Sequence, residues 1–228
     1  MIADLLDTPS PNHGDRKGLP VSLLVLHYTG MKTGKEALER LCDPDAGVSA
    51  HYLLEEDGRV FQLVPEERRA WHAGVSFWAG ETDINSISIG IEIVNPGHEH
   101  GYRPFPQAQI DALVSLVRGI CARHAIAIDR VVGHSDVAPD RKEDPGELFP
   151  WKRLSDEGLA LAPWSGEVEQ TPLLVEGTAA ALSKMGYGVD VFGLDACVTA
   201  FQRRFCPHAL GQGIDAQTLA AIGEIAGR

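Results

Sequence analysis

The sequence predicts an α/β protein in which helices flank a central mixed β-sheet, followed by a small all-α domain of three helices. Three observations support this prediction. Isoleucines alternate strictly over residues 87–94, and apolar residues recur at helical spacing over residues 107–124. Near residues 163–172 the composition of the chain changes and this apolar periodicity stops. With 228 residues, 44% hydrophobic and 23% charged, the chain has the composition of a folded globular protein.

The first half alternates strand and helix patterns. Residues 21–27 (VSLLVLH) form a short apolar run typical of a buried strand. Residues 33–42 are expected to be helical, because Thr33 and Glu36 have the spacing of a capping box and an apolar face follows. Residues 51–55 and 59–64 flank Asp57-Gly58, which is a strong signal for a β-hairpin.

The strand predicted over residues 87–94 has two unlike faces. Four isoleucines occupy one face, and Ser88, Gly90, Glu92 and Val94 occupy the other. Residues 107–124 then form the clearest helix of the sequence. A last short strand over residues 130–133 delivers His134.

The change in composition at residues 163–172 predicts a linker, since this segment is rich in Pro, Gly, Ser and Glu and lacks apolar periodicity. We therefore expect one domain over residues 1–165 and a second over residues 166–228. The second is expected to form three helices, over residues 173–185, 196–205 and 216–225. Eight of the nine histidines precede the linker, so the chemistry is expected in the first domain.

Charge and cysteine content limit the functional classes. The formal net charge of −12 argues against nucleic acid as a partner and against docking on an anionic membrane, and no run of apolar residues could insert into a bilayer. Four irregularly spaced cysteines are expected to be reduced, and no signal peptide is visible, which favours the cytoplasm. Removal of a leader would instead imply the periplasm or cell envelope. A monomer is expected.

Two histidines and an aspartate are candidate metal ligands. His27 and His134 each follow a predicted strand, and Asp144 lies ten residues after His134. Two imidazoles and one carboxylate form a known ligand set for catalytic Zn²⁺, with a fourth position left for water. A histidine at the end of a strand is also a common structural residue, so spacing alone leaves both interpretations open.

Glu92 and Lys142 are candidate catalytic residues. Glu92 interrupts an apolar strand, where a carboxylate is costly unless it faces a cleft, and there it could act as a general base. Lys142 stands two residues before Asp144 and could stabilise an oxyanion. The alternatives are a half-exposed strand glutamate and a solvated surface lysine.

Three further residues are candidates for substrate binding. Trp71 offers an aromatic platform for a sugar or peptide, although a core position is equally typical of tryptophan. His72 could bind substrate, ligate a metal or serve the fold. Asn95 could bind substrate or begin the turn at Pro96.

Five segments together resemble the zinc-dependent N-acetylmuramoyl-L-alanine amidases of the AmpD/AmiD type, whose fold the animal peptidoglycan recognition proteins share. In chain order they are LHYTG (26–30), SAHYLLEEDGRVFQLV (49–64), RAWHAGVSFWAG (69–80), INSISIGIEIVN (84–95) and VGHSDVAPDRKEDPG (132–146). The resemblance implies Zn²⁺ ligated by His27, His134 and Asp144, with Glu92 and Lys142 as catalytic residues.

The implied reaction is hydrolysis of the amide between N-acetylmuramic acid and L-alanine, in peptidoglycan or in anhydro-muropeptides, for turnover and recycling of the bacterial cell wall. Residues 200–205 and 213–222 resemble a small peptidoglycan-binding helical domain, except that Asp215-Ala216-Gln217 departs from its usual pattern. Two other functions stay open: a non-catalytic peptidoglycan recognition module, and a zinc carboxypeptidase of the stem peptide.

Overall fold

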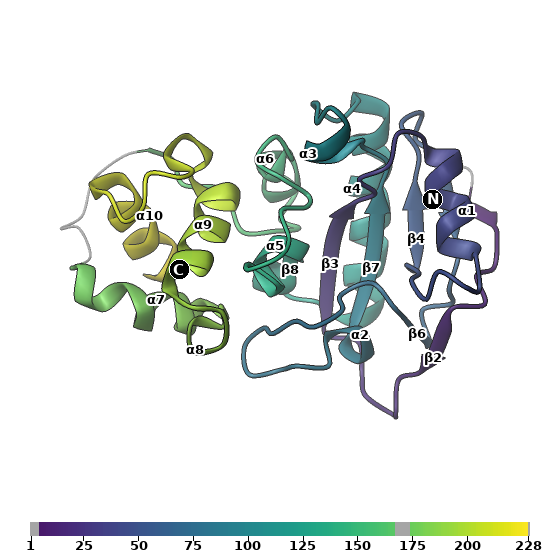
Figure 1. Ribbon diagram of the computed structural model, residues 1–228, viewed down its shortest axis with the longest axis horizontal. Helices are drawn as coiled ribbons and strands as arrows, with labels where there is room; N and C mark the ends of the chain where they lie inside the picture. The colour runs from purple at the N-terminus through teal and green to yellow at the C-terminus, as the bar shows by residue number, and fades with distance from the viewer. Residues whose placement is uncertain (1–4, 167–173, 228) are drawn as a thin grey trace.

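The structure is a computed structural model that describes residues 5–166 and 174–227 (Figure 1). Its centre is a six-stranded sheet, and a separate two-stranded ladder lies beside it. The strand order is β1 (Leu5–Asp7), β5 (Val60–Gln62), β4 (Tyr52–Leu54), β7 (Ser88–Ile93), β3 (Leu23–Tyr28) and β8 (Val131–Gly133); the ladder pairs β2 (His13–Asp15) with β6 (Arg68–Ala70).

The sheet is mixed, as the sequence predicts. β4 and β5 form the expected antiparallel hairpin, whereas β4, β7, β3 and β8 are parallel neighbours. In this parallel part, His27 of β3 pairs in register with Glu92 of β7. The carboxyl ends of these strands therefore meet at one edge of the sheet, which is where α/β proteins place their ligands.

Opposite faces of the sheet bury different partners. α4 (Gln107–His124) packs on one face, against alternate residues of β3 and β7 such as Leu24, Leu26, Ile89 and Ile91. α1 (Gly34–Cys42) packs on the other face, against Leu53 and its neighbours. Thr33 caps α1 as expected, because its hydroxyl accepts a hydrogen bond from the Glu36 amide at 3.2 Å.

The prediction for Ile87 was wrong in one respect. Ile87 ends the short helix α2 (Ile84–Ile87) and belongs to a different apolar cluster from Ile89, Ile91 and Ile93. The alternation of the strand therefore begins at Ser88. Ser88, Gly90 and Glu92 do share the face opposite α4, as predicted, and this face holds the candidate site.

Short helices connect the larger elements, and the sequence does not predict them because each is too brief to show a helical period. They are α3 (Gly97–His100), α5 (His134–Val137), α6 (Trp151–Ser155) and the 3₁₀ turns η1 (Ile128–Arg130), η2 (Val175–Gly177) and η3 (Pro207–Ala209). The most consequential is α5, which begins at the residue after β8 and therefore starts with His134.

The C-terminal unit, residues 174–227, is helical and lies at the β8 edge of the sheet (Figure 1). The predicted helices correspond to α7 (Thr178–Met185), α9 (Leu194–Phe205) and α10 (Ala216–Gly227), and α8 (Val189–Phe192) forms where only a turn is expected. Residue 173 and most of the predicted linker lie outside the described residues.

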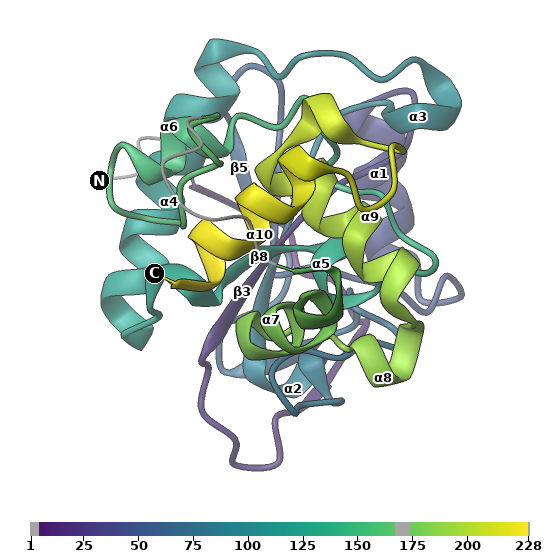
Figure 2. The same cartoon turned by 90° about the vertical axis from the view of Figure 1, so that its left-hand side faces the viewer.

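The two parts of the chain share one apolar cluster. Figure 2 shows the C-terminal helices in front of α5 and β8. The cluster joins Leu23, Val25, Trp78, Val132 and Val137 of the first part to Leu182, Tyr187, Val198, Phe201 and Phe205 of the second. The C-terminal unit is thus packed against the catalytic part. In the described ranges, no helix combines the length and apolarity that crossing a membrane requires.

Candidate metal centre and active site

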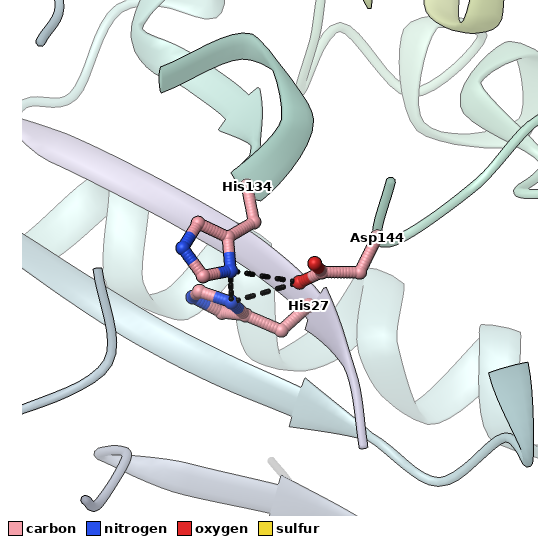
Figure 3. Close-up of side chains that lie close together, drawn as sticks. All are labelled: His27, His134 and Asp144. Atoms are coloured by element: carbon pink, nitrogen blue, oxygen red, sulfur yellow. Dashed lines mark hydrogen bonds and ion pairs between the residues drawn. The ribbon is translucent and has the colours of Figure 1, made fainter. Parts of the chain in front are cut away.

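Three predicted ligands come together at the carboxyl ends of β3 and β8 (Figure 3). Nδ1 of His27 lies 2.9 Å from Nδ1 of His134 and 3.1 Å from Oδ2 of Asp144, and the third distance, from His134 Nδ1 to Asp144 Oδ2, is 3.0 Å. All three residues are at most 6% exposed. His134 and Asp144 follow His27 by 107 and 117 residues in the sequence, so only the fold brings the three side chains together.

A chain of hydrogen bonds fixes the proton on His27. The Ser88 hydroxyl donates to the Ile84 carbonyl at 2.6 Å, so its oxygen accepts from Nε2–H of His72 at 3.1 Å. Burial and the neighbouring His27 keep the pKa of His72 well below its ordinary value, so the ring is neutral and its Nδ1 is an acceptor. Nε2–H of His27 therefore donates to His72 Nδ1 at 3.0 Å.

His134 is held in the same tautomer by a different group. Its Nε2–H donates to the Ala73 carbonyl at 3.2 Å. Both histidines therefore turn an unprotonated Nδ1 toward Asp144, whose carboxylate is also an acceptor. Three acceptor atoms thus converge without a donor, an arrangement that a cation satisfies.

The triangle of acceptor atoms fits a zinc ion. With sides near 3 Å, its centre lies about 1.7 Å from each corner. An ion slightly outside the plane would lie about 2.0–2.1 Å from all three, which is the usual bond length of Zn²⁺ to nitrogen and oxygen ligands. The donor set of two nitrogens and one oxygen also suits Zn²⁺, and three protein ligands leave a position open.

The segment that supports both histidines is itself fixed by two residues that the sequence analysis missed. Oδ1 of Asn85 accepts from the amides of His72 and Ala73, at 3.0 and 2.8 Å. A Cβ atom on Gly90 would lie 2.5–2.7 Å from the His72 ring, so only glycine leaves room for this imidazole. A glycine within an otherwise β-branched strand is a sequence signal for such a close approach.

Glu92 and Lys142 both line the cleft beside the three ligands. Oε2 of Glu92 is buried and has no hydrogen-bond partner among the described residues. Burial, together with the nearby Asp144, raises the pKa of Glu92 well above its ordinary value, while Lys142 acts in the opposite direction. A carboxyl group whose pKa is raised in a cleft is a candidate for taking up and returning a proton.

The cleft has a volume of about 400 Å³ and extends from the candidate ligands to α1. Trp71, which is half-buried, lines it as the sequence analysis expects, as do Ala37, Leu41 and Val48 on the far side. The cleft therefore offers an apolar wall beside a charged end, which suits a substrate that has both apolar and polar parts.

Two predicted substrate-binding residues have other environments. Both ring nitrogens of His72 are engaged, by His27 and Ser88, although the ring borders the cleft. Asn95 is fully buried, and its amide donates to the Arg103 carbonyl at 2.7 Å and accepts from the Gly97 amide at 3.1 Å. These contacts favour the second of the two roles that the sequence suggests for Asn95, which is to hold the turn after β7.

Comparison with known proteins agrees with this geometry. The family model described as N-acetylmuramoyl-L-alanine amidase matches residues 17–147, a range that contains all three candidate ligands, Glu92 and Lys142. The chain belongs to the N-acetylmuramoyl-L-alanine amidase family. As a member of this family it is a cell-wall amidase, and its fold is the amidase fold with a helical C-terminal unit.

Among the curated relatives of this amidase, N-acetylmuramoyl-L-alanine amidase AmiD of Escherichia coli is 37% identical over 224 residues, covering 88% of this chain and 80% of the relative. The 1,6-anhydro-N-acetylmuramyl-L-alanine amidase AmpD of Enterobacter cloacae is 36% identical and covers 67% of this chain and 89% of its own length. A solved complex of E. coli AmiD with anhydro-N-acetylmuramic acid-L-Ala-D-gamma-Glu-L-Lys superposes with a TM-score of 0.78 at 34% identity, covering 95% of this chain and 97% of that one.

Proposed function

We propose that this amidase is zinc-dependent and hydrolyses the amide between the lactyl group of N-acetylmuramic acid and the L-alanine of the stem peptide. The observation that carries the metal assignment is the convergence of three acceptor atoms, from His27, His134 and Asp144, without a donor between them. When bound, Zn²⁺ would supply a Lewis acid that acidifies water and polarises the scissile carbonyl.

The proton transfers are assigned to Glu92. Its carboxylate takes a proton from the attacking water and later delivers this proton to the leaving amine of alanine, so the C–N bond breaks with a neutral amine as the product. The raised pKa of Glu92 supports this role because it makes the carboxylate a stronger base for the proton of water. Lys142 donates a hydrogen bond to the carbonyl oxygen as negative charge develops there.

Soluble anhydro-muropeptides are the proposed main substrate, in line with the ligand of the AmiD complex and the names of the AmpD relatives. A role in recycling such fragments places the enzyme in the cytoplasm, and the four free cysteines are compatible with that reducing compartment. Intact peptidoglycan is the alternative substrate, which would place the enzyme in the cell envelope.

Mass spectrometry of digests of purified sacculi and of anhydro-muropeptides tests this assignment. Release of an intact stem peptide together with a peptide-free sugar is expected. Loss of single C-terminal residues would indicate a carboxypeptidase of the stem peptide, and binding without cleavage would indicate a recognition module. The rates of cleavage of sacculi and of anhydro-muropeptides by the same enzyme, compared with each other, decide which of the two is the main substrate.

Residues 166–228 are proposed to act as a peptidoglycan-binding unit, on the resemblance of residues 200–205 and 213–222 to such domains. A second binding unit would raise the effective concentration of the enzyme at the polymer. Retention of the inactive Glu92→Gln variant on purified sacculi tests this, with the cleft saturated by an anhydro-muropeptide. Retention that persists under saturation supports a second site; complete release would assign all binding to the cleft.

A further inference from the structure

Two consecutive arginines of α9 reach from the C-terminal unit into the catalytic part. Arg204 is 3% exposed, and its guanidinium donates to Oδ2 of Asp136 at 2.7 Å and to the Val131 carbonyl at 2.8 Å. It also stacks on Trp151, with its Cζ 4.2 Å from the ring centroid. A guanidinium buried in this way is held rigidly by its partners.

Asp136 links Arg204 to the metal ligand His134, because both residues lie on the single turn of α5. Asp136 is fully buried. Its Oδ2 also accepts from the amide of Gly133 at 2.7 Å, and its Oδ1 accepts from the hydroxyl of Tyr187 at 2.6 Å. The carboxylate thus bonds to the residue that precedes His134, while two of its three donors come from the C-terminal unit.

Arg203 contacts the other segment that carries a ligand. Its guanidinium lies 3.3 Å from Oε1 of Glu143 and 3.7 Å from Oε2 of Glu147. Glu143 stands between Lys142 and Asp144 in sequence. The backbone carbonyl of Asp144 in turn accepts from the amide of Ser135 at 2.9 Å, so the two ligand segments are also bonded to each other.

We propose that the C-terminal unit is a positioning element of the metal centre: Tyr187 and Arg204 set His134 through Asp136, and Arg203 sets Lys142 and Asp144 through Glu143. This inference rests on the proposed metal site and is separate from any binding of peptidoglycan by the same unit. None of the three residues touches the proposed metal, so each acts through another side chain.

The alternative is that these contacts only stabilise the fold, and metal affinity distinguishes the two roles. Partners that orient metal ligands typically change metal affinity by about 10–100-fold when removed. A contact that serves the fold alone lowers the melting temperature of the metal-free protein and leaves the metal dissociation constant of the folded protein unchanged.

Tyr187→Phe is the test variant because it removes only a hydroxyl group. Tyr52→Phe is its matched control: the Tyr52 hydroxyl also donates to a buried carboxylate, Glu66 at 2.7 Å, but the ring packs under α4 and away from the ligands. The measurements are the Zn²⁺ dissociation constant by chelator competition, the visible spectrum of the Co²⁺-loaded full-length protein, and the melting temperature without metal.

Tyr187→Phe is expected to weaken Zn²⁺ binding by about tenfold and to alter the Co²⁺ spectrum, whereas Tyr52→Phe changes only the melting temperature. Equal dissociation constants and spectra for both variants overturn the inference. If Tyr187→Phe does not fold, Arg203→Gln is the test variant. Its control is Arg123→Gln, which also removes an arginine–glutamate pair, with Glu66, but on a half-exposed arginine. A wild-type protein that binds no zinc would refute the proposed function and the inference with it. If the wild type binds zinc and the variants bind it with the same dissociation constant, only the inference is refuted.

Discussion

Replacing Glu92 by glutamine separates the proton-transfer role of this residue from its place in the fold. The side chain keeps its size, so the packing of β7 between β3 and β4 is retained. Loss of a general base typically lowers turnover by about 10²–10⁴-fold, which corresponds to about 3–5 kcal/mol in the activation barrier. The three ligand atoms are untouched, so the zinc content is expected to stay at the wild-type level.

The stability of the same variant is expected to be equal to or higher than that of the wild type. Oε2 of Glu92 is buried without a hydrogen-bond partner among the residues that the structure describes, so the charged form is costly to bury. Glutamine has no charged form, so the variant avoids this cost. The Glu92→Gln melting temperature is therefore predicted not to fall, although the catalytic rate does, as is common where an active site sacrifices stability for function.

The assay is kcat and KM on a purified anhydro-muropeptide, together with metal analysis and a thermal melt. Glu99→Gln is the control, because Glu99 also borders the cleft but is exposed, and its loss changes the net charge equally. This control should retain turnover within about threefold, on the ordinary scale of a surface substitution. A Glu92→Gln enzyme with kcat within about tenfold of the wild type would refute the assignment of Glu92 as the base.

Three further predictions concern the metal, the acid stability and the C-terminal unit. His27→Ala and Asp144→Ala should each abolish zinc retention and activity, and stoichiometric zinc in either variant by metal analysis would disprove the ligand set. Glu66→Gln should cost about 2–3 kcal/mol of unfolding free energy at pH 7, because hydrogen bonds from Arg123, His124 and Tyr52 outweigh burial and lower the pKa of Glu66 to about 2. This contribution is complete above the ordinary pKa near 4.5 and is lost as the pH falls toward 2, so denaturation curves of the variant and the wild type should converge there. Deletion of residues 166–228 should destabilise the catalytic part by at least the cost of breaking a buried ion pair, about 3–5 kcal/mol, since Asp136 loses Arg204 and Tyr187; a truncated protein with the wild-type melting temperature would contradict this.

The deletion illustrates how far the sequence alone could predict the domain organisation. All candidate ligands precede the linker, which suggested that catalysis would not need the C-terminal residues. The structure adds contacts that the sequence does not predict, because an apolar cluster and the Arg204–Asp136 pair cross between the two parts. Arg204 lies 68 residues after Asp136, and local periodicity contains no signal for a pair at that separation.

The elements that were predicted correctly are those with a strong local period. The isoleucine alternation of β7 and the apolar repeat of α4 each extend over enough residues to identify the element. β1, β2 and β6 have three residues each, and α2, α3 and α5 have four. Elements this short show no helical or strand period of their own, and these six lack a turn signal such as the Asp57-Gly58 pair that identified the equally short β4 and β5.

In the candidate site too, the sequence suggests which residues matter but not how they are arranged in space. His27, His134 and Asp144 were candidates from their residue types, since two imidazoles and a carboxylate suit zinc, and the family resemblance made them the proposed ligands. Their mutual geometry was not predictable, because it depends on the register of β3 against β7 and on the turn from β8 into α5. The prediction for His72 shows the consequence: a histidine beside a tryptophan suggested substrate binding, whereas its contacts make it the acceptor that selects the tautomer of His27.

The protonation of the metal centre therefore depends on groups that never meet the substrate. Gly90 leaves the space for the His72 ring, the Ser88 hydroxyl accepts a hydrogen bond from that ring, and the Ala73 carbonyl accepts a hydrogen bond from His134. Each of these groups turns a ligand nitrogen toward the same point before any cation is present. Since a ligand that must rotate or lose a proton binds metal less tightly, this ordered set of hydrogen bonds would favour a cation at the three proposed ligands, although neither His72 nor Ala73 is one of them.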